Sequence, residues 1–273
     1  MKFTKFFWQI KLTSAIALAM ICFASKLARV QPANLLPIVF NNREPLDNRG
    51  APGDTQGGGT RDGQKCPNIN TREHLTALVP FSPQKQGKPY VWGWTVTDSP
   101  SILLYVPDSP ILMKAGVFTL WDETDPNDRN HKSIYEGTFT LIGTPGIISL
   151  NIPSTIKLEP NKRYHWYVKV PLSCERGDIN DEVSGWIFRT ELTEPKTFVS
   201  ETVREKVRFY AANGIWFDAV RLLAQPRQNN ADNNLDVAWA ELLKGANWES
   251  FANKPIVPCC TLEASSEGTG NVR

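Results

Sequence analysis

The sequence carries almost no net charge, and its small excess of basic residues lies at one end. Its 273 residues include 30 Lys and Arg against 28 Asp and Glu. Three lysines fall within the first 24 residues, where no acidic residue occurs, so the remainder holds 27 basic and 28 acidic residues. Nucleic acids and anionic membrane surfaces attract proteins through clustered positive charge. The composition therefore argues against a nucleic-acid partner and against electrostatic membrane binding.

Recognisable catalytic motifs are also missing. The three histidines, His74, His131 and His165, fall in different predicted elements, and none lies in a known motif. No Gly-x-Ser-x-Gly sequence is present, and the glycine run at 57–59 lacks the Gly-Lys-Ser/Thr of a phosphate-binding loop. We therefore predict no catalytic residues and no cofactor.

One acidic stretch offers a conceivable calcium site, because hard cations need several oxygen ligands. It contains Asp122, Glu123, Asp125 and Asp128. An acidic turn without a metal is the simpler interpretation, and we predict no metal site.

Long apolar runs are scarce, and the one that occurs is N-terminal. Lys2, Lys5 and Lys11 precede the run Leu12–Ala24, which has the order and length of a secretory signal peptide. A single membrane anchor is the alternative, although a bilayer needs about 20 apolar residues. We expect residues 1–28 to be a signal peptide, the protein to be exported to the periplasm or beyond, and no spanning segment to remain after its removal.

Cysteine is infrequent, and no Cys-x-x-Cys pair suggests a zinc site. An oxidising compartment favours disulfide bonds. Cys66 and Cys174 flank the strand-rich region and are the natural pair. Cys259 and Cys260 are adjacent, so free, mutually bonded and intermolecular states are all open.

Short apolar and aromatic runs, separated by Pro, Gly, Asn and Asp, predict an antiparallel sandwich over residues 66–192. The Gly/Pro-rich residues before it, 29–65, are expected to be a flexible lead-in. The fold class is β-rich α+β, with an immunoglobulin-like antiparallel β-sandwich followed by a small C-terminal helical unit. The predicted strands are Leu75–Val79, Tyr90–Val96, Ile102–Val106, Gly116–Asp122, Ser133–Leu141, Gly146–Ile152, Tyr164–Leu172 and Ser184–Glu191.

Helical periodicity predicts the unit at 193–252. A first helix has one apolar stripe and is capped by Ser200 or Thr197; its stripe comprises Val199, Val203, Val207 and Tyr210. A second helix follows Gly214 and should end at Pro226, and a third spans Leu235–Ala246. Residues 253–273 form a tail with the two adjacent cysteines, and we expect disorder from Ala264 onward.

Alternating aromatic residues on one predicted strand suggest a ligand platform. Tyr90, Trp92 and Trp94 project from the same face. Pro89 and Gly93 suit an edge strand, which would leave this face partly exposed to solvent. The alternative is that the three rings fill the core, as large aromatic side chains often do.

Several segments together resemble one protein family. They are LTALVP at 75–80, LYVP at 104–107, TPGII at 144–148, YHWY at 164–167 and GWIFR at 185–189. The chain from about residue 49 to residue 246 is similar to a secreted cyanobacterial family catalogued as domain-of-unknown-function family 928. The resemblance implies export, a β-rich domain followed by helices, and a Cys66–Cys174 bond. It implies no activity.

Together these features suggest an exported, non-enzymatic envelope protein that binds another envelope protein or a cell-wall polysaccharide. The alternative is a hydrolase acting on envelope polymers, with acids drawn from separate strands. Two carboxylates about 5–10 Å apart across a cleft would favour the hydrolase.

Overall fold

The computed structural model describes residues 36–45, 53–57, 73–82, 89–108, 113–174, 178–192, 201–229 and 233–264. The chain divides into two compact units, Met1–Leu36 and Pro37–Arg273. The second unit contains every strand and helix described below. None of the helices in the described part of the chain is long and apolar enough to cross a membrane.

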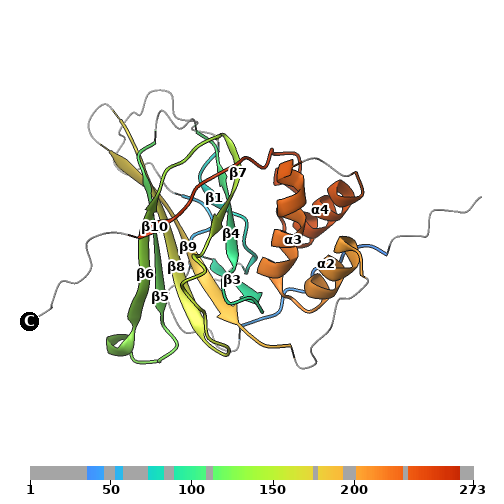
Figure 1. The fold of residues 1–273 in the computed structure, drawn as a ribbon, viewed down its shortest axis with the longest axis horizontal. Helices are drawn as coiled ribbons and strands as arrows, with labels where there is room; N and C mark the ends of the chain where they lie inside the picture. Colours follow the sequence, from blue (N-terminus) through green and yellow to red (C-terminus); the bar gives the residue numbers. More distant parts are fainter. Residues whose placement is uncertain are drawn as a thin grey trace, which may run out of the picture. The chain divides into compact units, whose positions relative to one another are not determined.

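The predicted β-sandwich with a helical unit is confirmed (Figure 1). A seven-stranded sheet has the order β10-β6-β5-β8-β9-β3-β2, and a three-stranded sheet has the order β1-β4-β7. The strands are β1 Thr76–Ala77, β2 Phe81–Ser82, β3 Tyr90–Thr95, β4 Ser101–Val106, β5 Gly116–Asp122, β6 Lys132–Phe139, β7 Gly146–Asn151, β8 Arg163–Leu172, β9 Ile179–Arg189 and β10 Glu263–Ala264. The helices are α2 Val203–Ala212, α3 Trp216–Asn229 and α4 Asn233–Gly245, with 3-10 turns η2 Asp128–Asn130 and η3 Glu249–Phe251.

One strand pair departs from the predicted antiparallel arrangement. β3 and β9 run parallel, with Trp92 opposite Trp186 and Trp94 opposite Phe188. A tight hairpin forces its two strands to be antiparallel, whereas strands far apart in the sequence can meet in either direction. Two strands of the smaller sheet, β4 and β7, and three strands of the larger one, β5, β6 and β8, separate β3 from β9 along the chain.

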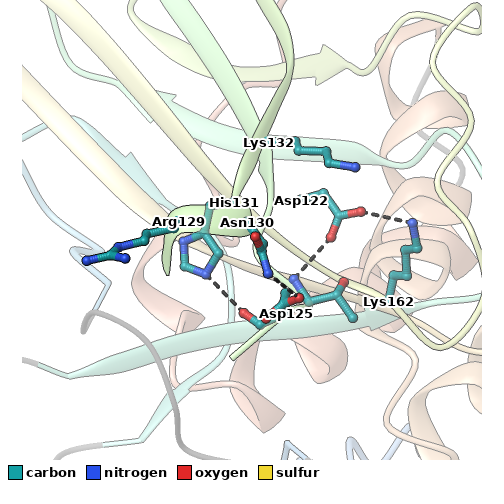
Figure 2. A pocket seen from close by; sticks show the side chains of 8 residues that line it. Asp122, Asp125, Arg129, Asn130, His131, Lys132 and Lys162 are labelled. Carbon is teal, nitrogen blue, oxygen red and sulfur yellow. Dashed lines mark hydrogen bonds and ion pairs between the residues drawn. The ribbon is translucent and has the colours of Figure 1, made fainter. Parts of the chain in front are cut away.

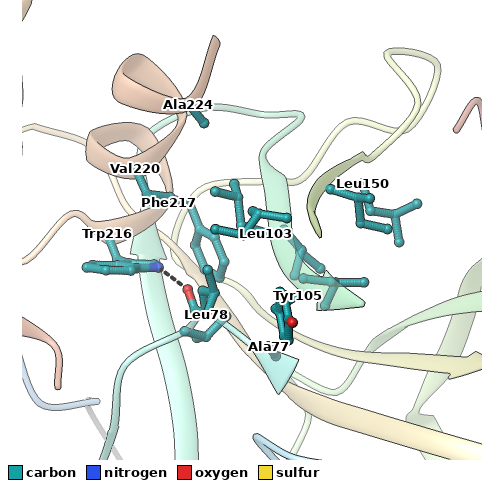
Figure 3. Close-up of a cluster of buried hydrophobic side chains, with 14 of the residues drawn as sticks. Ala77, Leu78, Leu103, Tyr105, Leu150, Trp216, Phe217, Val220 and Ala224 are labelled. Atoms are coloured by element: carbon teal, nitrogen blue, oxygen red, sulfur yellow. Dashed lines mark hydrogen bonds between the residues drawn. The ribbon is translucent and has the colours of Figure 1, made fainter. Parts of the chain in front are cut away.

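Alternation along the strands divides the larger sheet into two faces. On β8, Tyr164, Trp166 and Val168 are buried in the main core, whereas His165 and Tyr167 project to the opposite face. The core continues through the smaller sheet into the helical unit. Figure 3 shows Leu78 and Leu103 of the sandwich region packed with Phe217 and Val220 of α3.

Three indole groups help fix the C-terminal part of the chain. Trp216 donates its indole N–H to the carbonyl of Leu78 at 3.0 Å, and Trp248 donates to the carbonyl of Val79 at 3.0 Å. Trp239 donates to the carbonyl of Ala252 at 3.2 Å. Buried indole N–H groups need such acceptors, so these bonds fix where the helices pack as well as satisfying polar atoms.

A buried carboxylate also joins α3 to the sheet. Asp218 accepts hydrogen bonds from the Thr95 hydroxyl at 2.8 Å and from the Val96 backbone N–H at 3.1 Å. Beside it, Gly93 leaves room for Phe217, since a Cβ at Gly93 would lie 2.6 Å from that ring. β3 therefore supplies both a hydrogen-bonding site and a steric recess for one turn of helix.

Two helix boundaries differ from the predictions. α2 is capped by Thr202, whose side chain and that of Glu205 form a reciprocal capping box, so Ser200 and Thr197 were wrong as caps. α3 continues through Pro226 to Asn229. Packing beyond the proline overrides its low helix propensity, because the Arg227 guanidinium lies over the Trp239 ring of α4 at 5.4 Å.

Backbone from both ends of the domain joins the two sheets. Asp54 pairs with Ser184 of β9 and Gln56 pairs with Thr76 of β1, although the sequence predicts this segment as a flexible lead-in. On the other side, residues 255–257 bond to Ile147 of β7, and β10 then pairs with β6. Ala264, the expected start of a disordered tail, is thus part of a strand, whereas residues 265–273 lie outside the described residues.

Removing the Asp218 carboxylate tests how the helical unit is held. We expect Asp218→Ala to lower the free energy of unfolding by about 1–3 kcal/mol, because two buried donors lose their acceptor. Asp218→Asn keeps an acceptor oxygen and should lose less. Urea unfolding of both variants measures the difference, with the exposed Glu136→Gln as control.

The same residue predicts a pH dependence. Burial raises the pKa of Asp218, more than the hydrogen bonds from Thr95 and Val96 lower it. The folded state therefore binds the Asp218 proton more tightly than the unfolded state does. The stability that this proton contributes is full below the unfolded pKa of Asp218 and is lost as the pH rises through the folded pKa. Asp218→Asn should reduce the loss of stability that sets in as the pH rises above about 4, the ordinary pKa of an Asp side chain. An unchanged pH slope in that variant would contradict the assignment.

Candidate functional site

The three aromatic residues predicted as a ligand platform share one face of β3, but they are buried. Tyr90, Trp92 and Trp94 are 5%, 3% and 3% exposed, and they form a cluster with Trp186 and Phe188 of β9. This cluster lies on the face of β3 and β9 opposite the main core. The structure therefore favours the alternative that the rings pack inside the protein, and it does not support an exposed platform.

Arg43, in the N-terminal segment 37–45, contacts this cluster directly. Its carbonyl accepts hydrogen bonds from the indole N–H groups of Trp92 and Trp94, at 2.8 and 3.1 Å. Its guanidinium lies 3.9 Å from the centre of the Trp94 ring, a cation–π geometry. The strand pattern predicted the shared face correctly, but it could not reveal that a distant segment would contact that face.

The cysteine predictions have different outcomes. Cys66 lies outside the described residues, so its bond to Cys174 stays a prediction. The sulfur atoms of Cys259 and Cys260 contact each other, and Cys260 is 9% exposed. Their free, mutually bonded and intermolecular states stay open hypotheses.

Two of the three histidines converge on one carboxylate, although the sequence places them far apart. The Nδ1 atom of His165 lies 3.2 Å from one Glu123 oxygen, and Nδ1 of His131 lies 3.8 Å from the other. His165 is only 1% exposed and stacks on Trp186 at 4.1 Å between ring centres. Its Nε2 atom has no hydrogen-bond partner among the described residues. Tyr167 completes this group, with its hydroxyl 2.8 Å from His165 Nδ1.

A polar pocket of about 520 Å³ adjoins this group at the loop between β5 and β6 (Figure 2). The loop supplies most of its lining, and Lys162 reaches it from the start of β8. The lining residues are Asp122, Thr124, Asp125, Arg129, Asn130, His131, Lys132 and Lys162. No local sequence pattern predicted this pocket. The turn-rich stretch 124–131 between two predicted strands could have indicated the loop part of the lining. The contribution of Lys162 could not be predicted, because it depends on how β8 pairs with β5.

Hydrogen bonds within the loop occupy its carboxylates. Asp122 accepts from the backbone N–H of Thr124 at 3.0 Å and from Lys162 at 2.9 Å. Asp125 accepts from the backbone N–H of Asn127 and the side-chain amide of Asn130, both at 2.8 Å. These bonds hold the stretch as a hydrogen-bonded acidic turn. Among the described residues, no three His, Cys, Asp or Glu side chains are grouped to hold a metal ion.

The charges of the pocket are set by these contacts. Burial tends to raise the pKa of Asp122, but hydrogen bonds from Thr124 and Lys162 outweigh it and hold that pKa below its usual value. Hydrogen bonds to Glu159 and Asp122 raise the pKa of Lys162. Burial, together with the charges of Glu123 and Glu182, raises the pKa of Tyr167 to about 12. At neutral pH, Asp122 is therefore ionised, Lys162 is protonated and the Tyr167 hydroxyl is neutral.

The burial of the aromatic cluster generates a test of its role. Trp92→Ala and Trp94→Ala should each lower the free energy of unfolding by about 3–5 kcal/mol, because each removes a buried ring and leaves a cavity. The exposed Ile142→Ala is the control and should change stability by less than about 0.5 kcal/mol. Thermal and urea unfolding measure these losses. Wild-type stability in both tryptophan variants would contradict a packing role and would favour the predicted ligand surface.

Comparison with known proteins gives one assignment. Neither the curated proteins nor the solved structures contain a match to this chain. A family model described as Domain of Unknown Function (DUF928) matches residues 56–256. The matched region extends from the segment that pairs with β1 to the segment that pairs with β7, so it spans the sandwich and the helical unit. Because the match covers most of its length, the chain belongs to the DUF928 family.

Proposed function

We propose that this protein is an exported, non-enzymatic envelope protein that binds a cell-wall polysaccharide in the pocket of the β5–β6 loop. The single observation that carries the proposal is the lining of that pocket. All eight lining residues are polar or charged, and they come mostly from an exposed loop. A site of this kind suits a hydroxyl-rich ligand, whereas pockets for apolar ligands are lined mainly by hydrophobic side chains.

Export and a cyanobacterial envelope are part of the proposal, and they rest on the sequence. The first 24 residues carry three lysines, no acidic residue and the apolar run Leu12–Ala24, in the order of a signal peptide. The motifs that resemble the secreted cyanobacterial family support the same location. An exported protein would encounter wall polymers as its most abundant polar ligands.

Contacts within the pocket favour binding over hydrolysis. A glycosidase needs a carboxylic acid with a raised pKa to protonate the leaving group, whereas the pKa of Asp122 is lowered. Asp122 and Asp125 come from the same loop and are both held by hydrogen bonds. The His131 Nε2 atom faces the Asp125 carbonyl at 3.1 Å, so this histidine is engaged as well.

The size of the pocket favours a saccharide over a protein partner. Stable protein partners usually bury about 800 Å² on each side. A pocket of about 520 Å³ falls within the range for small ligands, and one or two sugar units of a longer chain would fill it. A protein partner is therefore the second outcome that the experiment should detect.

Binding can be tested with soluble fragments of envelope polysaccharide and isothermal titration calorimetry. Lys132 lines the pocket, is exposed and extends toward the other lining groups in Figure 2, so Lys132→Ala should weaken binding about tenfold without changing stability. Lys169→Ala removes the same charge from an exposed position on β8 outside the pocket, and it should bind as the wild type does.

Three results would contradict the proposal. Equal affinity in the Lys132→Ala variant would remove the pocket as the binding site. New reducing ends in the incubated polysaccharide would indicate a hydrolase instead. Capture of one envelope protein with no affinity for any polysaccharide fragment would favour the protein-binding alternative.

A further inference from the structure

We infer that the pocket selects an anionic ligand, namely the carboxylate of an acidic polysaccharide, and that Lys132 binds this group. The inference rests on the proposed function, because it specifies the class of saccharide that the same pocket would take. It follows from counting which donors and acceptors of the pocket are already used within the protein.

The two carboxylates that line the pocket already accept hydrogen bonds from within the protein. One Asp122 oxygen accepts from the Thr124 N–H and the other accepts from Lys162. One Asp125 oxygen accepts from the Asn127 N–H and the other accepts from the Asn130 amide. Each carboxylate oxygen that lines the pocket thus has a donor within the protein. An ionised carboxylate has about four lone-pair sites, so these bonds take about half of the acceptor capacity of Asp122 and Asp125.

The donors are in surplus. Lys162 has three N–H groups, and it directs bonds to Asp122 and Glu159, each at 2.9 Å. Lys132 and Arg129 together carry eight more N–H donors. Neither makes a side-chain hydrogen bond or an ion pair with another residue in the part of the chain that the structure describes. In Figure 2, Lys132 extends to the same side of the pocket as Lys162, with Asp122 between them.

Among the lining residues themselves, basic side chains outnumber acidic ones. The lining has two acidic residues, Asp122 and Asp125, against the three bases Arg129, Lys132 and Lys162. Three further acids lie beside the lining and are engaged by it or by its neighbours: Glu159 pairs with Lys162, and Glu123 faces the two histidines. Asp128 lies 3.7 Å from His131. Lys132 projects toward the other lining groups in Figure 2, and its side chain has no ion pair or hydrogen bond with any of the described residues.

A carboxylate matches this surplus, because an ionised carboxylate accepts hydrogen bonds and donates none. Charge-assisted hydrogen bonds are also stronger than those to a neutral hydroxyl. Lys132 is exposed, so the attraction is screened by salt and its effect on affinity should be moderate. These properties predict a ligand preference that weakens as salt concentration rises.

The experiment compares two probes with the same sugar backbone, one with ionised carboxylates and one with these groups esterified. Oligogalacturonate carries a carboxylate on each sugar, and its methyl ester is neutral. Calorimetry with the exported protein, at low and at high salt, should give about tenfold tighter binding of the charged probe at low salt and a smaller difference at high salt. A third probe, built from neutral sugars that carry sulfate groups in place of carboxylates, shows whether the pocket prefers carboxylate or accepts any anion.

Variants at one position then assign the selectivity. Lys132→Gln should lose most of the preference for the charged probe, and Lys132→Arg should keep it. Lys169→Gln is the matched control on β8 and should behave as the wild type does. Stability measured by thermal unfolding should be the same in all three variants, because the Lys132 side chain has no hydrogen bond or ion pair with another residue in the described part of the chain.

The outcomes separate the two proposals. Equal binding of the charged and neutral probes would overturn the anion preference and leave polysaccharide binding in place. A preference that survives Lys132→Gln would overturn the role of this lysine. Equal or tighter binding of the sulfated probe would overturn the assignment to carboxylate. Failure of every saccharide probe to bind would contradict the proposed function and, with it, this inference.

Discussion

Pairing between the two sheets through short terminal segments is the constraint on which the sandwich depends. The three-stranded sheet has strands of two and six residues, and it does not share a strand with the larger sheet. Residues 54–57 bond to β9 on one side and to β1 on the other, and residues 255–264 connect β7 with β6. These bonds supply partners to backbone groups that would otherwise form open sheet edges. The core between the sheets is thereby held from both sides.

The helical unit is attached to this frame by polar contacts placed inside an apolar interface. Asp218 and the indoles of Trp216 and Trp248 each bond to backbone or side chains of residues 78–96. Hydrophobic contact alone has no direction, whereas a hydrogen bond requires a defined distance and angle. The buried polar groups therefore fix the position of the helices on the sandwich, and apolar burial supplies most of the stability.

Much of the fold could be predicted because its signals are local. Alternation and turn residues identified the seven strands of six or more residues and also β1, and the stripe of Ala238, Trp239 and Leu242 identified α4. β2 and β10 are two residues long and have no period to detect. The parallel β3–β9 pair, the Glu123 group and the pocket depend on which distant segments become neighbours. That information lies in tertiary pairing, and one sequence read by local pattern does not contain it.

The position of Arg43 has a consequence for where this domain begins. The family match starts at residue 56, yet the carbonyl that accepts from two buried indoles belongs to a residue 13 positions earlier. Ile38 and Phe40, also outside the match, are part of the main core. A recombinant protein cut at the family boundary would lack these groups and would leave two indole N–H donors without their acceptor. Its surface would then gain aromatic area of the kind that drives self-association. The folding unit is longer than the region by which the family is recognised.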